Sequence, residues 1–160
     1  MIIKKITKNI VIILILFLLT GCLKEKASLI IKMDNEIINI NTDSIYSSEE
    51  AIIFPAVVRS SGEKPVETEY RGIELVNILI ANNIEFDKFE KATFNASDGY
   101  RIILSMDEIK DKSNVYLTFE REGEILKSKK QGGNGPFQLI IRRDPFSQRW
   151  IKHVNEIILE

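Results

Sequence analysis

The sequence predicts an α+β fold, a compact mixed β-sheet domain with few short helices, and three observations carry that prediction. After residue 27 the chain divides into short β-rich segments bounded by turn residues. Only one segment of any length places apolar residues at helical spacing. The chain contains no internal repeat and no low-complexity tract. Residues 22–160 are too few for two ordinary domains, so we expect one hydrophobic core.

The first predicted element is a hairpin at the start of this domain. Two apolar-rich runs, Ser28–Met33 and residues 36–40, are separated by Asp34 and Asn35, which tolerate the conformations of a tight turn. Met106–Lys110 predicts one helical turn. The later segments with strand character are residues 92–95, 100–104, 115–120, 137–142 and 150–159, the last of which could be partly helical.

The one amphipathic helix is expected to begin near residue 73. The apolar residues that recur at three- and four-residue spacing are Ile73, Val76, Leu79 and Ile80. This pattern predicts a helix of about three turns, the average length in globular proteins. Asn82 and Asn83 predict its end, because Asn accepts the left-handed conformation on which helices often end.

The N-terminal segment has the layout of an export signal. Lys4, Lys5 and Lys8, with no acidic residue among them, precede an apolar run over residues 10–19. A helix of about 10 residues spans roughly 15 Å, whereas a bilayer core of about 30 Å needs about 20 residues. The run is therefore too short for a comfortable permanent span.

The run Leu19-Thr20-Gly21-Cys22 resembles the lipobox of bacterial lipoproteins, in which the cysteine is acylated and becomes the new N-terminus. The resemblance implies a signal peptide at residues 1–21, a tether at 22–27 and a domain at 28–160. It also implies palmitate-type lipid on Cys22 that holds the protein at the cell membrane, on the extracytoplasmic side. The alternative is an uncleaved N-terminal anchor, which would likewise leave the domain outside the cytoplasm.

Composition excludes several classes of function. Residues 22–160 contain 19 basic and 23 acidic residues, a formal charge of −4. Nucleic acid is not an expected partner, because binding to phosphates needs a clustered basic face. Cys22 is the only cysteine. Once it carries lipid, the domain has no disulfide, no thiol nucleophile and no thiolate metal ligand.

The longest loop, residues 129–136, is rich in glycine. Gly132, Gly133 and Gly135 lie between two predicted strands. Glycines let a backbone approach another group closely, and bare N–H groups can cradle an anion. A plain flexible connection remains the alternative. The loop is not a phosphate-binding P-loop, because no Gly-Lys-Ser/Thr ending follows.

Residues 70–79, Tyr-Arg-Gly-Ile-Glu-Leu-Val-Asn-Ile-Leu, resemble the helix start of the molybdopterin-binding domain of the sulfite oxidase family. Further segments that follow that family in order are residues 96–100, 114–126, 132–141 and 149–152. The match covers residues 66–159, and the order and spacing of the segments carry it. The resemblance implies the fold of that domain, an oxidoreductase activity and molybdopterin as cofactor.

The family's molybdenum-binding cysteine lies just upstream of this helix, and residues 51–60 contain no cysteine here. His153, the only histidine, does not make a metal site alone, because such sites need several convergent donors. We therefore expect no catalytic residues, no metal ligands and no bound cofactor, although the resemblance leaves molybdopterin open.

The resemblance implies that Lys152 contacts a cofactor. With Arg149, Lys152 could hold an anion near the glycine loop. Asp98 and Tyr100 could present a carboxylate and a phenol to the same ligand. The predicted cofactor-binding residues are therefore Asp98, Tyr100, Gly132, Gly133, Gly135, Arg149 and Lys152. Solvated charges at Arg149 and Lys152 and a plain turn at Asp98-Gly99 are the alternatives. Trp150 is expected to be a core anchor.

Three functions follow, in order of preference. The first is a non-catalytic module, held to the lipid membrane through Cys22, that binds a small anionic or pterin-like ligand or docks on a membrane protein. The second is a subunit of a molybdopterin-dependent oxidoreductase that retains the cofactor. The third is a structural domain at the cell surface. Fold alone does not decide between them.

Overall fold

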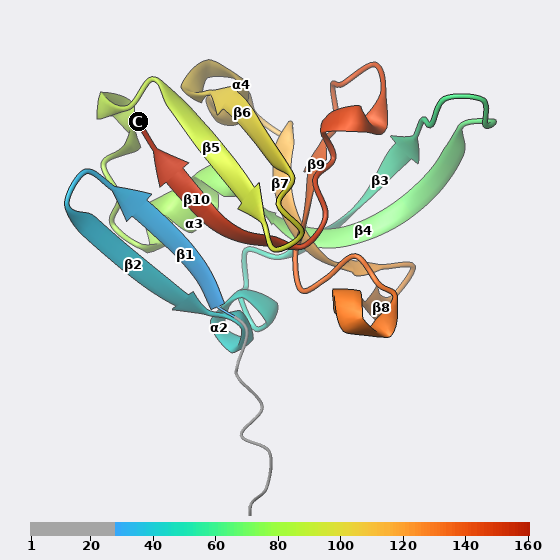
Figure 1. The fold of residues 1–160 in the computed structure, drawn as a ribbon, viewed down its shortest axis with the longest axis horizontal. Helices are drawn as coiled ribbons and strands as arrows, with labels where there is room; N and C mark the ends of the chain where they lie inside the picture. The colour runs from blue at the N-terminus through green and yellow to red at the C-terminus, as the bar shows by residue number, and fades with distance from the viewer. Residues whose placement is uncertain (1–27) are drawn as a thin grey trace, which may run out of the picture.

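The computed structural model describes residues 28–160, which form two five-stranded sheets with a few short helices (Figure 1). The predicted signal peptide, the tether and Cys22 lie outside the described residues. Over residues 28–160, no helix is long and apolar enough to cross a membrane.

The first sheet has the strand order β2-β1-β10-β5-β6, at the left of Figure 1. Its strands are β1 (Ser28–Met33), β2 (Glu36–Asn41), β5 (Lys91–Ala96), β6 (Arg101–Ser105) and β10 (Val154–Leu159). β1 and β10 are parallel and the other pairs are antiparallel. The predicted hairpin is confirmed, since Ser28 pairs with Asn41, Met33 pairs with Glu36, and Asp34 takes a left-handed φ of 39°.

The second sheet is antiparallel, with β7 at its centre. Its strands are β3 (Ile52–Val58), β4 (Val66–Glu74), β7 (Val115–Arg121), β8 (Glu124–Ile125) and β9 (Gln138–Ile141). The β3–β4 hairpin was not predicted. Gly72 allows β4 to lie close to β7, because a Cβ there would meet the Leu117 carbonyl oxygen at 2.5 Å.

The helices are short. They are α2 (Thr42–Tyr46), α3 (Leu75–Ala81) and α4 (Met106–Lys110), and the 3-10 turns are η1 (Phe86–Lys88), η2 (Lys129–Gln131) and η3 (Ser147–Arg149). The single turn predicted at Met106–Lys110 is confirmed, with a capping box between Ser105 and Glu108. The predicted helix end is confirmed as well, because Asn82 is the C-cap and Asn83 has a φ of 55°.

Two predicted boundaries are wrong. The amphipathic helix begins at Leu75, not near residue 73, because Ile73 and Glu74 continue β4 and pair with Leu117 and Tyr116 of β7. The helix is therefore seven residues long, about two turns. The last predicted strand begins at Val154, four residues later than expected, because His153 takes a φ of 58° that breaks the extended chain.

One core joins both sheets and α3. Fully buried side chains include Leu29 and Phe94 from the first sheet, Leu117 and Phe119 from the second, and Leu79 from α3. The single expected core is therefore confirmed for the described residues.

Candidate functional site: a pocket of three arginines

Three arginines meet at a pocket of about 360 Å³ in the second sheet. The lining residues are Pro55, Ala56, Val57, Arg59, Ser113, Arg142 and Arg143. This set, called the arginine pocket below, contains three guanidinium groups and no carboxylate. Strand β3 and the residue after it form one wall, and the loops before β7 and after β9 form the other.

Arg59 follows the end of β3, and its backbone is clamped to η3. The N–H of Arg59 donates to Ser147 Oγ at 2.8 Å, and the N–H of Ser147 donates to the Arg59 carbonyl at 3.1 Å. The guanidinium of Arg59 makes no hydrogen bond or ion pair with any residue of the described part of the chain. This half-buried cation is therefore available to a ligand.

Arg142 and Arg143 follow β9, and the buried side chain and backbone of Asn114 hold them. Both backbone N–H groups donate to Asn114, one to its carbonyl at 2.9 Å and one to its Oδ1 at 3.1 Å. Asn114 is 4% exposed, and its Nδ2 donates to the Glu108 carbonyl at 3.1 Å. Because Asn114 is buried and both polar atoms of its side chain are hydrogen-bonded, the turn that carries the two arginines is held in position.

The two guanidiniums differ in how much of their charge is matched. Arg143 forms an ion pair with Asp111 and donates to the Lys112 carbonyl at 3.2 Å. Arg142 donates one bond to the Ser113 carbonyl at 3.3 Å and lies over the ring of Phe54 at 5.6 Å. Arg142 therefore has no carboxylate partner among the described residues, so the pocket keeps an excess of positive charge.

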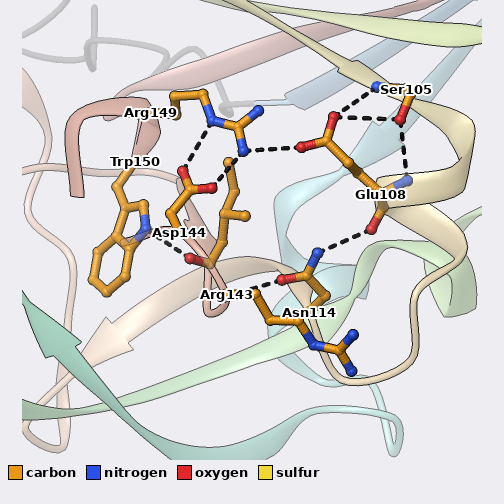
Figure 2. A network of polar contacts seen from close by, with 8 residues as sticks. Ser105, Glu108, Asn114, Arg143, Asp144, Arg149 and Trp150 are labelled. Carbon is orange, nitrogen blue, oxygen red and sulfur yellow. Dashed lines mark hydrogen bonds and ion pairs between the residues drawn. The ribbon is translucent and has the colours of Figure 1, made fainter. Parts of the chain in front are cut away.

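A polar network beside the pocket joins α4 to the loop after β9, as Figure 2 shows. Arg149 donates from Nε to Asp144 Oδ2 at 3.0 Å, forms a second bond from Nη2 to the same carboxylate, and pairs through Nη2 with Glu108 Oε1 at 2.9 Å. These bonds raise the pKa of Arg149 above its usual value, and the bonds to Asp144 contribute most. Trp150 Nε1 donates to the Ile141 carbonyl at 2.9 Å.

Glu108 is both a cap of α4 and an acceptor for Arg149. Burial acts to raise the pKa of Glu108, but the bonds from Arg149 and Ser105 outweigh burial and hold the pKa below its ordinary value of 4.5. A carboxylate with a depressed pKa contributes stability above its unfolded-state pKa, and that stability is lost as the pH falls through the folded-state value.

Glu108→Gln is expected to be less stable than the wild type near neutral pH and to lose less stability on acidification, because it lacks this titrating group. Urea denaturation at a series of pH values from about 7 to about 3 measures the free energy of unfolding of both proteins. Glu67→Gln, at an exposed position of β4, is the control. Equal acid-induced losses in Glu108→Gln and the wild type would contradict the prediction.

The glycine loop does not have the bare N–H groups that were expected of it. The N–H groups of Gly132, Gly133 and Gly135 donate to the carbonyls of Lys129, Ser128 and Lys127 at 3.0, 3.1 and 2.7 Å. A Cβ on Gly133 or Gly135 would meet the carbonyl oxygens of residues 127 or 126 at 2.2 Å. The glycines therefore allow a close approach to residues 126 and 127, which lead into the loop. The expectation that the three glycine N–H groups are free to bind an anion is wrong.

The other predicted site residues lie in two places. Asp98 accepts a hydrogen bond from the Tyr100 N–H at 3.1 Å, and this bond lowers the pKa of Asp98. The same bond forms the plain turn at Asp98-Gly99, which was the alternative to a ligand-binding role. His153 links this turn to the glycine loop, because its carbonyl accepts from Ser97 and its N–H donates to Asn134. Lys152, next to it, is exposed.

Arg149 is directed elsewhere, into the network with Asp144 and Glu108. The structure thus brings the Asp98 turn and the glycine loop together but gives Arg149 two carboxylate partners. A role for these residues in ligand binding stays a prediction. The arginine pocket was missed, although one signal was present: two consecutive arginines directly after a buried strand.

The residues present do not fit a molybdenum centre of the kind that the sulfite oxidase resemblance implies. The segment where that resemblance places the metal-binding cysteine forms β3 and a wall of the arginine pocket, and it supplies Arg59 and no thiol. Within residues 28–160, no group of three or more His, Cys, Asp or Glu side chains is arranged to hold a metal ion.

Comparison with known proteins identifies a likeness of fold. No protein-family model matches the chain, and no curated protein matches it. The solved structure of the sulfane dehydrogenase SoxCD from Paracoccus pantotrophus is similar, with a TM-score of 0.66 and 16% sequence identity. The match covers 87% of this chain and 39% of that chain, so this chain spans about two fifths of the chain it matches. The predicted α+β architecture is confirmed, and it resembles that of the dehydrogenase.

Proposed function

We propose that this protein is a membrane-anchored, extracytoplasmic lipoprotein whose domain is a non-catalytic binding module for a small oxyanion. The observation that carries the proposal is the convergence of Arg59, Arg142 and Arg143 on one pocket that no carboxylate lines. The lipid anchor rests on the run that ends at Cys22.

Guanidinium groups suit this ligand class because they offer paired, charge-assisted N–H donors that match the oxygens of sulfate, phosphate or a carboxylate. Arg59 and Arg142 lack carboxylate partners among the described residues, so binding an anion would break no ion pair there. A pocket of about 360 Å³ also suits the acidic group of a larger, pterin-like ligand.

The fold likeness to a sulfane dehydrogenase supports a second candidate, a subunit of a molybdopterin-dependent oxidoreductase that retains the cofactor. The lack of a protein thiol in residues 51–60 counts against it. Molybdenum analysis of protein purified from its native host separates the two candidates. Stoichiometric molybdenum would favour the second, and we expect none.

Arg59→Ala and Arg142→Ala are each expected to weaken sulfate binding by about 10- to 150-fold, because each removes a charge-assisted bond worth about 1.5–3 kcal/mol. Isothermal titration of the mature protein with sulfate, and separately with phosphate, measures the dissociation constants. Arg101→Ala is the matched control, because Arg101 lies on β6 in the other sheet and bonds to Asn95.

Lys152→Ala, in the same titrations, tests the site that the sequence predicted. A loss of affinity in Lys152→Ala with no loss in Arg59→Ala or Arg142→Ala would move the anion site to the glycine loop. If the wild type binds neither sulfate nor phosphate, the oxyanion proposal is wrong and a purely structural surface domain becomes the better account.

A further inference from the structure

The segment that contains β8 and η2 presents lysines to solvent. Lys127, Lys129 and Lys130 are exposed, and Ile125 beside them is 55% exposed. Glu124 is the one acidic residue in residues 124–131, which gives this segment a formal charge of +2 within a mature chain of −4. No carboxylate of residues 28–160 forms an ion pair with any of the three lysines. Ile125 and the three lysines are called the lysine surface below.

Hydrogen bonds give the loop behind the lysine surface a defined conformation. Ser128 and Gln131 form a capping box around η2, and Gly132 ends η2 in the left-handed conformation. The three glycine N–H groups are bonded within the loop, as described above. The lysines therefore project from a folded platform, which reduces the entropy lost when they bind a surface.

The lysine surface lies at the end of the domain where the described chain begins. Ser28 pairs with Asn41, which directly precedes α2. Tyr46 of α2 donates to the carbonyl of Pro136, at the end of the glycine loop, at 3.4 Å. Figure 1 shows α2 and the β8–η2 segment together on the lower side of the molecule. Lys91, bonded to Glu160 at the far end of the first sheet, marks the opposite end.

The length of the tether places this end close to the membrane. The six residues 22–27 reach at most about 20 Å when fully extended. A lipid on Cys22 would therefore hold the Ser28 end within that distance of the headgroups and give the lysine surface a high effective concentration there. Lysines attract anionic headgroups, and an exposed Ile can enter the interface.

We infer that the lysine surface docks on anionic lipid headgroups of the membrane that carries the anchor, and so fixes the orientation of the domain. This inference rests on the proposed lipid anchor and is independent of the arginine pocket. Each lysine near an anionic surface changes the ratio of docked to undocked protein by about fivefold. The docked state is weakened by salt, because the charges are exposed.

Lysine acylation followed by mass spectrometry tests the inference on the full lipidated protein in vesicles. On vesicles that contain phosphatidylglycerol, Lys127, Lys129 and Lys130 should be acylated at least about fivefold more slowly than on neutral phosphatidylcholine vesicles. High salt should abolish the difference. Lys64, in the β3–β4 turn, and Lys88 and Lys91 are internal controls whose rates should not change.

A pair of matched variants sharpens the test. Lys127→Gln with Lys129→Gln should remove most of the protection at Lys130, since two lysines together contribute about 25-fold. Lys64→Gln with Lys88→Gln, an equal loss of charge elsewhere, should leave that protection intact. Equal acylation of the lysine surface on neutral and anionic vesicles overturns the inference.

Flotation of the same samples with the vesicles tests separately whether the chain carries a lipid anchor. A chain that floats with neutral vesicles is anchored, whatever its acylation pattern. If the chain does not float with neutral vesicles, the anchor proposal fails. In that case only the binding of headgroups by the lysine surface is supported, provided that anionic vesicles bind the chain and protect its three lysines. The inference is overturned if they do not.

Discussion

Trp150→Ala is expected to destabilise the domain by about 3–5 kcal/mol, the usual cost of truncating a buried aromatic side chain. Trp150 is 6% exposed, which confirms the prediction that it is a core anchor. Its ring meets that of Tyr70 edge to face at 6.2 Å, and its Nε1 donates to the Ile141 carbonyl. Ile141 directly precedes Arg142, so the same truncation removes support for the arginine pocket.

Urea denaturation at neutral pH measures this effect, and Trp150→Phe separates its two parts. The phenylalanine variant keeps most of the packing but loses the hydrogen bond from Nε1, which costs about 0.5–1.5 kcal/mol. The Ile141 carbonyl still accepts from the Asp144 N–H at 3.2 Å. We therefore expect its free energy of unfolding to lie between those of the alanine variant and the wild type. An alanine variant within about 1 kcal/mol of the wild type would show that Trp150 is not an anchor.

Cys22→Ala is expected to abolish lipidation completely, because alanine offers no sulfur to which an acyl chain can be attached. By resemblance to bacterial lipoproteins, the variant should then accumulate as an uncut precursor. Intact mass of the protein expressed in a bacterial host, together with partition into detergent, measures both outcomes.

Gly21→Ala is the matched control for this variant, since it keeps a small residue before the thiol and should still be lipidated and cut. If Cys22→Ala is cut at the same bond and still carries lipid, the assignment of the anchor to Cys22 is wrong. If both variants remain uncut, Gly21 itself is required for processing.

Much of the fold could be predicted from the sequence, because the signals are local. The Ser28–Met33 strand and its hairpin follow from apolar runs around a two-residue turn, and α4 forms at the stretch where one helical turn was expected. The end of α3 at Asn82 and Asn83 follows from the conformational tolerance of Asn. Each of these depends on residues within a few positions of one another.

The start of α3 could not be predicted, because a distant partner decides it. Ile73 fits the apolar face of a helix, but β7 offers a backbone ladder that continues β4 through Glu74. Ile73 is 3% exposed in the strand, so burial is satisfied either way. Local periodicity cannot choose between two conformations that bury the same side chain.

The candidate site could not be predicted from the sequence for the same reason, since distant partners position its residues. Arg59 is clamped by Ser147, 88 positions away, and Arg143 by Asn114, 29 positions away. Arg149 carries a charge that suits anion binding, but Asp144 and Glu108 form ion pairs with it in the fold. The sequence by itself determined the α+β fold class and the type of charge available. Only the fold decided which cations have carboxylate partners and which face an open pocket, because electrostatic pairing depends on distance in space and not on position in the chain.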